Sequence, residues 1–144
     1  MKAALESWQF WAIGSAIFAA LTAIFAKIGV AGINPDFATF IRTLIVIAVL
    51  ALIVSVTAQW QAPSAITSRT WIFLALSGLG TGASWLCYFR ALKIGDAARV
   101  APLDKMSILL VAVFGVAFLG ERLSLLNWLG VAMCAGGIAL LALR

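Results

Sequence analysis

The sequence contains no histidine and few charged residues. Only 10% of its 144 residues are Asp, Glu, Lys or Arg, whereas 65% are hydrophobic. The absence of histidine removes the commonest general base and the commonest metal ligand. No nucleophile–base pair stands out either, so we expect no enzymatic activity, no metal and no cofactor. Because a soluble domain carries about 25% charged residues, the composition predicts an integral membrane protein.

Cysteine and acidic residues are also scarce. Cys87 and Cys134 both lie inside apolar runs without CxxC spacing, so we interpret them as packing residues rather than disulfide partners or metal ligands. Five acidic residues face ten basic ones, giving a pI near 9.9. No basic surface interleaved with aromatic residues accompanies this excess, so we expect no nucleic-acid partner.

Five long apolar runs dominate the chain. Crossing a bilayer as a helix takes roughly 20 mostly apolar residues. The runs cover about 8–30, 37–58, 71–91, 97–119 and 124–143. They predict an all-α membrane protein with five transmembrane helices in one bundle, forming a single domain over residues 1–144. The first run is longer than the apolar core of a signal peptide, so we expect it to remain in the mature protein.

The connections between the runs are short. Asn34, Pro35 and Asp36 precede the second run, where Asn can cap a helix, Pro suits its first position and Asp favours its positive end. Residues 59–70 form the longest and most polar loop. Pro102 predicts a kink inside the fourth run, because proline cannot donate the helical hydrogen bond.

Basic residues are distributed unevenly between the two ends of the runs. Three fall on one side, namely Lys2, Arg69 and Arg122. Seven fall on the other side, namely Lys27, Arg42, Arg90, Lys93, Arg99, Lys105 and Arg144. Short loops rich in Lys and Arg stay in the cytoplasm. The pattern therefore predicts an outer N-terminus and a cytoplasmic C-terminus. We expect a multi-pass protein of a bacterial or archaeal inner membrane.

The third run carries a stripe of hydroxyl groups. Ser77, Thr81, Ser84 and Tyr88 follow one another at intervals of four, three and four residues, which places them on one helical face, with Trp85 beside them. Two interpretations remain open. The stripe lines a water-filled or ligand-lined cavity, or its hydroxyl groups bond to a neighbouring helix or to their own helix.

Four charged residues lie within the cytoplasmic half of the predicted spans: Lys27, Arg42, Asp104 and Lys105. A charge at the centre of a membrane helix costs about 2.5–3.5 kcal/mol. The short Asp104 side chain cannot reach far and needs a partner, a proton or water; as a partner, Arg42 is the first choice and Lys27 the second. Lys105 is a poor partner, because adjacent helical residues point about 100° apart. For Lys27, and less so for the deeper Arg42, snorkelling of the side chain to the interface would lower this cost. The cluster is otherwise either a structural ion-pair network or a net-positive vestibule for a polar or anionic group.

Several segments together resemble a known family. Phe25–Gly29 ends the first run, and Tyr88–Leu92 ends the third. Leu119-Gly120-Glu121-Arg122-Leu123-Ser124 precedes Asn127-Trp128-Leu129-Gly130 and a glycine-rich last run. With Arg42 early in the second run, these segments resemble the EamA domain of the drug/metabolite transporter superfamily over nearly the whole chain. The Gly-Glu-Arg turn is the most specific part of the likeness.

The resemblance implies a transporter of half the usual size. Larger members carry two five-span units of opposite orientation with a substrate cavity between them, so this chain is expected to need a second copy or another five-span partner. The small four-span multidrug members place a glutamate in the middle of their first helix, where this chain has Ile17-Phe18-Ala19-Ala20. Proton-coupled export of cationic drugs by that mechanism is therefore not expected. The uneven basic residues also argue against an antiparallel homodimer.

We therefore predict a transporter that moves a small polar or anionic metabolite across the inner membrane, embedded in lipid and working as a dimer. The predicted substrate-binding residues are Lys27, Arg42, Thr81, Ser84, Trp85, Tyr88, Asp104 and Lys105. Two alternatives stay open. One is a component of a flippase for an anionic lipid or lipid-linked sugar, and the other is an accessory membrane subunit that does not transport.

Overall fold

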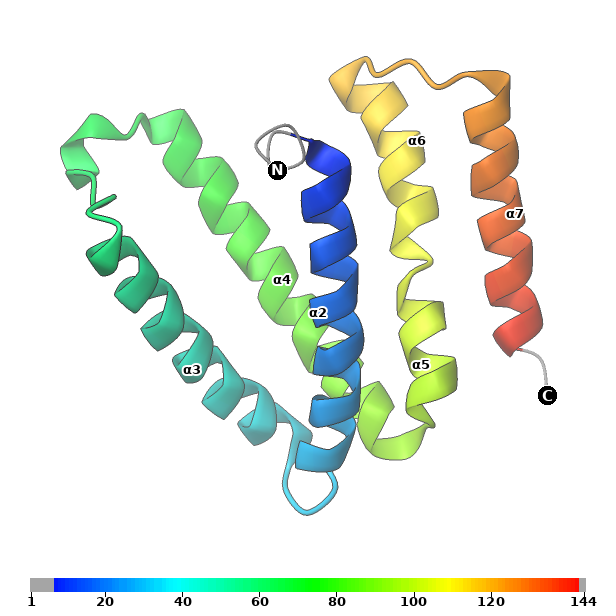
Figure 1. Ribbon diagram of the computed structural model, residues 1–144, viewed down its shortest axis with the longest axis horizontal. Coiled ribbons are helices and arrows are strands. Elements are labelled where there is room, and N and C mark those ends of the chain that lie inside the picture. The colour runs from blue at the N-terminus through cyan, green and yellow to red at the C-terminus, as the bar shows by residue number, and fades with distance from the viewer. Residues whose placement is uncertain (1–6, 143–144) are drawn as a thin grey trace. The chain divides into compact units, whose positions relative to one another are not determined.

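The computed structural model describes residues 7–142, which form helices and contain no strand (Figure 1). The helices are α2 (Trp8–Gly29), α3 (Pro35–Val56), the short 3-10 helix η1 (Pro63–Ala65), α4 (Ser68–Ile94), α5 (Ala97–Asp104), α6 (Ser107–Leu119) and α7 (Leu125–Ala142). Five segments are long and apolar enough to cross a membrane, the fourth being α5 and α6 together. The predicted all-α membrane fold is thus confirmed. Lys2 and Arg144 lie outside the described residues.

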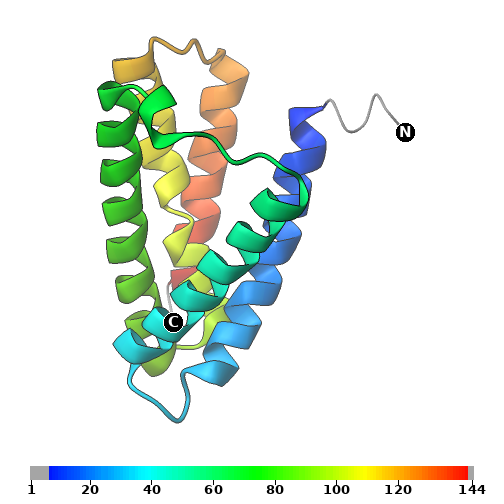
Figure 2. The ribbon, with the colours of Figure 1, turned by 90° about the vertical axis from the view of Figure 1, so that its left-hand side faces the viewer.

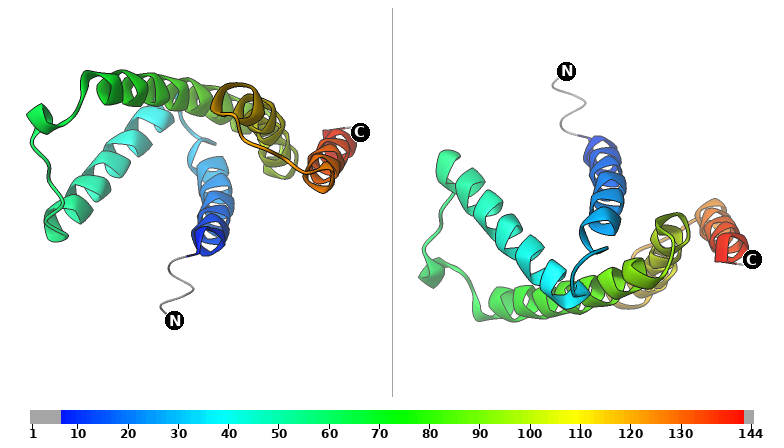
Figure 3. Two further views of the ribbon diagram at one scale, coloured as in Figure 1. Left: turned by 90° about the horizontal axis from the view of Figure 1, so that it is seen from above. Right: turned by 90° about the horizontal axis from the view of Figure 1, so that it is seen from below.

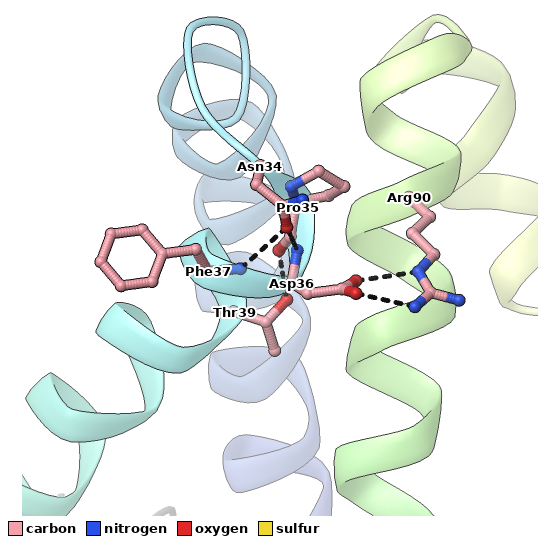
Figure 4. Close-up of polar contacts among 6 residues, drawn as sticks. All are labelled: Asn34, Pro35, Asp36, Phe37, Thr39 and Arg90. Atoms are coloured by element: carbon pink, nitrogen blue, oxygen red, sulfur yellow. Dashed lines mark hydrogen bonds and ion pairs between the residues drawn. The ribbon is translucent and has the colours of Figure 1, made fainter.

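The start of α3 follows the local chemistry of its first residues. The Asn34 Oδ1 atom accepts hydrogen bonds from the backbone N–H groups of Asp36 (2.9 Å) and Phe37 (3.2 Å), as Figure 4 shows. Pro35 is the first residue of the helix. A backbone N–H at this position has no acceptor within the helix, so its absence in proline costs no helical hydrogen bond. The predicted cap is therefore confirmed, and it fixes where the second span begins.

Pro102 divides the fourth span into two helices. α5 ends at Asp104, two residues beyond the proline, and α6 begins at Ser107. The backbone N–H groups of Lys105 and Met106 donate to the carbonyls of Pro102 and Leu103, at 3.0 Å each, so the chain turns more tightly here than in an α-helix. The predicted kink is confirmed, and Lys105 lies at the break rather than inside a helix.

The chain divides into two compact units, which meet in sequence between Ile94 and Gly95. In the first unit, α4 packs against both α2 and α3. Its buried side chains come from the end of α2, the start of α3 and the end of α4, and include Ala26, Ala38, Phe89 and Leu92. From this joined end α2 and α3 diverge (Figures 1 and 3), and α3 leans away from α4 (Figure 2).

The second unit contains α5, α6 and α7, with α7 packed against the other two. Gly120 ends α6 with a φ of 69°, a left-handed conformation that glycine adopts without steric cost. The backbone N–H of Glu121 then donates to the carbonyl of Gly115 at 3.1 Å. Large apolar side chains are exposed along all five spans in the described range, as befits helices that face lipid. That the whole chain forms a single domain stays a prediction.

Candidate functional site

A pocket of about 460 Å³ lies within the first unit, between α2 and α3. Thr22, Phe25 and Ala26 line it from α2, and Ile41, Arg42 and Ile45 line it from α3. Phe89 of α4 contributes to the lining as well. Among the described residues that line the pocket, Arg42 is the only charged one, and its remaining neighbours are apolar apart from Thr22.

Aromatic rings flank the guanidinium group of Arg42. Its Cζ atom lies 3.9 Å from the centroid of the Trp85 ring and 5.7 Å from the centroid of the Phe89 ring. The negative face of an aromatic ring attracts a cation, but it offers no in-plane acceptor for the five guanidinium N–H donors. Within residues 7–94, the structure gives Arg42 no salt bridge. This half-buried cation therefore has donors available for an anionic ligand in the pocket.

A salt bridge joins α3 to α4 at the joined end of the first unit. Arg90 donates from Nε to Oδ1 of Asp36 at 2.8 Å and from Nη2 to Oδ2 at 2.7 Å (Figure 4). Two parallel charge-assisted hydrogen bonds of this kind fix the relative orientation of the two side chains and strengthen their interaction. Sequence reasoning missed this pair, although both residues were predicted at the same side of the membrane.

Two lysines bind backbone carbonyls at the same end. Lys93 Nζ donates to the carbonyls of Val30 (2.9 Å), Ala31 (2.6 Å) and Ile33 (3.2 Å), which follow the end of α2. Lys27 Nζ donates to the carbonyl of Leu92 at 2.8 Å. The last carbonyls of a helix lack partners within the helix, and a cation there also opposes the negative end of its dipole. Both lysines thus tie α2 to α4.

Only part of the predicted hydroxyl stripe gathers near the pocket. Thr81 Oγ1 donates to the Ser77 carbonyl at 2.9 Å, the ordinary bond of a threonine to its own helix. Thr81 and Ser84 are both exposed, whereas Trp85 and Tyr88 are half-buried. The structure therefore brings Arg42 and Trp85 together. A role for Thr81, Ser84 and Tyr88 in ligand binding stays a prediction.

Asp104 and Lys105 pair with each other in the second unit, with 3.2 Å between Lys105 Nζ and Asp104 Oδ2. The expectation that these neighbours point apart was wrong. That expectation assumed a continuous helix, but α5 ends at Asp104 and Lys105 lies in the break caused by Pro102. The pairing of Asp104 with Arg42 or Lys27 stays a prediction.

Three sequence relatives match half or more of the chain. A protein named as an uncharacterized transporter in the cobO 3′ region of Sinorhizobium sp is 71% identical over 137 residues, covering 95% of this chain and 97% of the relative. The uncharacterized transporter YxxF of Bacillus subtilis is 25% identical over 141 residues, covering 97% of this chain but only 44% of YxxF.

A third relative comes from Pseudomonas fluorescens and is named ArnE, a probable 4-amino-4-deoxy-L-arabinose-phosphoundecaprenol flippase subunit. It is 34% identical over 73 residues, covering 50% of this chain and 61% of ArnE. No solved structure matches the chain. The sequence model of the EamA-like transporter family matches residues 6–143, and the chain therefore belongs to this family.

Proposed function

We propose that this protein is a half-size transporter that moves a small organic anion across the cell membrane, with Arg42 as the anion-binding group. The observation that carries the proposal is a half-buried guanidinium in an apolar pocket, without a carboxylate partner among residues 7–94. A charged residue within a membrane span is costly, which makes it a candidate for a functional site by default. An anion in the pocket would satisfy both the charge and the donors.

The other cations of α2 and α4 near this pocket support the proposal by contrast. Arg90 binds Asp36, and Lys93 binds three backbone carbonyls. Lys27 binds the Leu92 carbonyl. These three groups are engaged in holding helices together, whereas Arg42 contacts ring faces that leave its N–H donors open. Of these cations, Arg42 is the one suited to binding and releasing an anion during transport.

The transporter works with a second five-span unit, either another copy of this chain or a related protein. Support comes from the alignment with YxxF, in which this chain accounts for 44% of the larger relative. The asymmetric distribution of Lys and Arg supports an outer N-terminus and a cytoplasmic C-terminus. In that orientation the joined end of the first unit, with Lys27, Arg90 and Lys93, faces the cytoplasm.

The test is uptake of radiolabelled organic anions into proteoliposomes by the wild type and three variants. Arg42→Gln should reduce uptake to the level of empty liposomes, and Arg42→Lys should retain a part, because Lys keeps the charge but not the planar donors. Arg69→Gln is the matched control, since Arg69 also lies near a ring, with Cζ 5.9 Å from the Phe73 centroid, but outside the pocket. Normal uptake by Arg42→Gln would contradict the proposal.

A second candidate is a subunit of a flippase for an anionic lipid or lipid-linked sugar. The likeness to ArnE favours it, as does the apolar lining of the pocket, which suits a hydrocarbon chain. The same proteoliposomes distinguish the two functions. Movement of a fluorescent isoprenyl phosphate between leaflets, without uptake of any soluble anion, would assign the flippase function.

A further inference from the structure

The pocket in the first unit offers one charged group and little other polar chemistry. Thr22 is its second polar side chain, and the other lining residues carry only hydrocarbon side chains or none. A ligand with many hydroxyl groups would lose its hydrogen bonds to water and find few replacements, which is costly for each buried polar group. The lining therefore selects against strongly hydrated anions.

The size of the pocket also exceeds what a bare anion needs. A water molecule occupies about 30 Å³ in the liquid, so 460 Å³ corresponds to roughly fifteen waters. A carboxylate or phosphate on Arg42 would fill only a small part of this volume. The rest is bordered by Phe25, Ile41 and Ile45, whose apolar surfaces are best covered by hydrocarbon.

From these two features we infer that the substrate is an amphipathic anion, with a single charged head bound to Arg42 and a hydrocarbon body of several carbons lying between α2 and α3. The inference rests on the proposed function and narrows its substrate class from organic anions in general. The head and body together could come from a soluble carboxylate or from an isoprenyl phosphate lipid. Both have the same chemistry, one charged oxygen group and an apolar tail.

Calorimetric titration of the wild type in phosphatidylcholine nanodiscs tests the inference, with empty nanodiscs correcting for partition into lipid. The probes are acetate, butanoate, hexanoate and octanoate, together with gluconate as a hydroxylated six-carbon anion and geranyl phosphate as an isoprenyl phosphate. Each added methylene should lower Kd about fourfold until the pocket is filled. Gluconate should bind at least tenfold more weakly than hexanoate.

A glycine at the pocket provides a variant that should reduce the pocket volume without removing Arg42. Gly29 lines the pocket, and a Cβ atom built there meets nothing within 4 Å, so Gly29→Leu should fold while filling part of the space. It should weaken octanoate binding at least tenfold, and by a larger factor than it weakens acetate binding. Gly14→Leu is the matched control on the same helix, with equally open surroundings outside the pocket, and should bind octanoate like the wild type.

The outcomes separate the inference from the function on which it rests. If Kd does not change with chain length, or gluconate matches hexanoate, the inference fails, while loss of binding in Arg42→Gln would still support the proposed function. If Arg42→Gln binds every probe like the wild type, the proposed function fails with it. If Kd falls along the carboxylate series and geranyl phosphate binds much more tightly than octanoate, the amphipathic class is supported and its source is a lipid.

Discussion

The first unit contains two kinds of cationic side chain, which differ in their partners. At its joined end, Arg90, Lys93 and Lys27 bind a carboxylate or backbone carbonyls. Further along α3, Arg42 lies over Trp85 and, within residues 7–94, lacks a salt bridge. Arg42 lies six positions beyond Asp36, which corresponds to about 9 Å along a helix. The difference teaches that neighbouring cations in one unit have different partners, which supports the proposal that Arg42 binds a ligand while the other three hold helices together.

The cost of placing each of these cations within the membrane is offset to a different extent by its partners. A charge at the centre of a membrane helix costs about 2.5–3.5 kcal/mol and less towards the helix ends, and a cation–π contact returns about 0.5–2 kcal/mol. The rings beside Arg42 offset part of this cost but leave its N–H donors without acceptors, so the proposed anion would add stabilisation at this site. By contrast, the two hydrogen bonds between Arg90 and Asp36 complete that pair without a ligand.

Giving Arg42 a permanent partner should produce the largest effect, because it would convert the open cation into a paired one. Ala38 lines the same pocket one helical turn before Arg42, and an acid four residues N-terminal to a cation pairs well with it. Ala38→Asp should therefore weaken anion binding about tenfold or more, measured as Kd in nanodiscs. Ala38→Asn has nearly the same size without the charge, and should stay much closer to the wild type. Equal losses in both variants would show that packing at this position, rather than charge, governs the pocket.

Removing the ring beneath Arg42 should have a smaller effect on the same measurement. Trp85→Leu deletes a cation–π contact of about 0.5–1 kcal/mol, so the Kd for the anion should rise about two- to fivefold as the guanidinium loses its orientation. Trp85→Phe should recover most of the affinity, because it restores a ring face. Trp71→Leu, at the other end of α4, serves as the control. If Trp85→Leu lowers thermal stability without changing Kd, the ring is structural and does not position Arg42.

Sequence reasoning predicted the spans well because each depends on local properties. The apolar runs, the cap at Asn34 and the break at Pro102 are each recognised from residues that are close together in the sequence. The contacts of Arg90 and Lys93 were missed because they join residues 54 to 63 positions apart, and the sequence gives no sign of which helices pack together. The same limit applies to Phe89. Its segment resembles the family, but the sequence does not show that its ring lies near Arg42 of α3. For Lys105 the error was local: its pairing with Asp104 depends on the exact position of the helix break, which the sequence did not give.

Removing the cap of α3 should destabilise the end of the first unit where α3 begins, without changing the surroundings of Arg42. Asn34→Ala deletes the acceptor of two backbone N–H groups, which should lower stability by about 1 kcal/mol. The loss should be visible as a lower melting temperature in detergent. Asn34→Asp retains an acceptor and should melt near the wild type. Anion affinity per folded molecule should be unchanged in both variants, and a selective loss of affinity in Asn34→Ala would show that the pocket depends on this end.

The smallest effect is expected for the salt bridge between Asp36 and Arg90, because its side chains are 44% and 61% exposed. Exposed pairs contribute little to stability. Arg90→Gln and Asp36→Asn should each lower the melting temperature slightly, and the double variant should melt no lower than the worse single variant, because both changes remove one interaction. Neither single variant should reduce anion uptake as Arg42→Gln does. If Arg90→Gln abolishes uptake while the protein remains folded, Arg90 also contacts the substrate. A salt bridge would then not distinguish structural cations from substrate-binding ones.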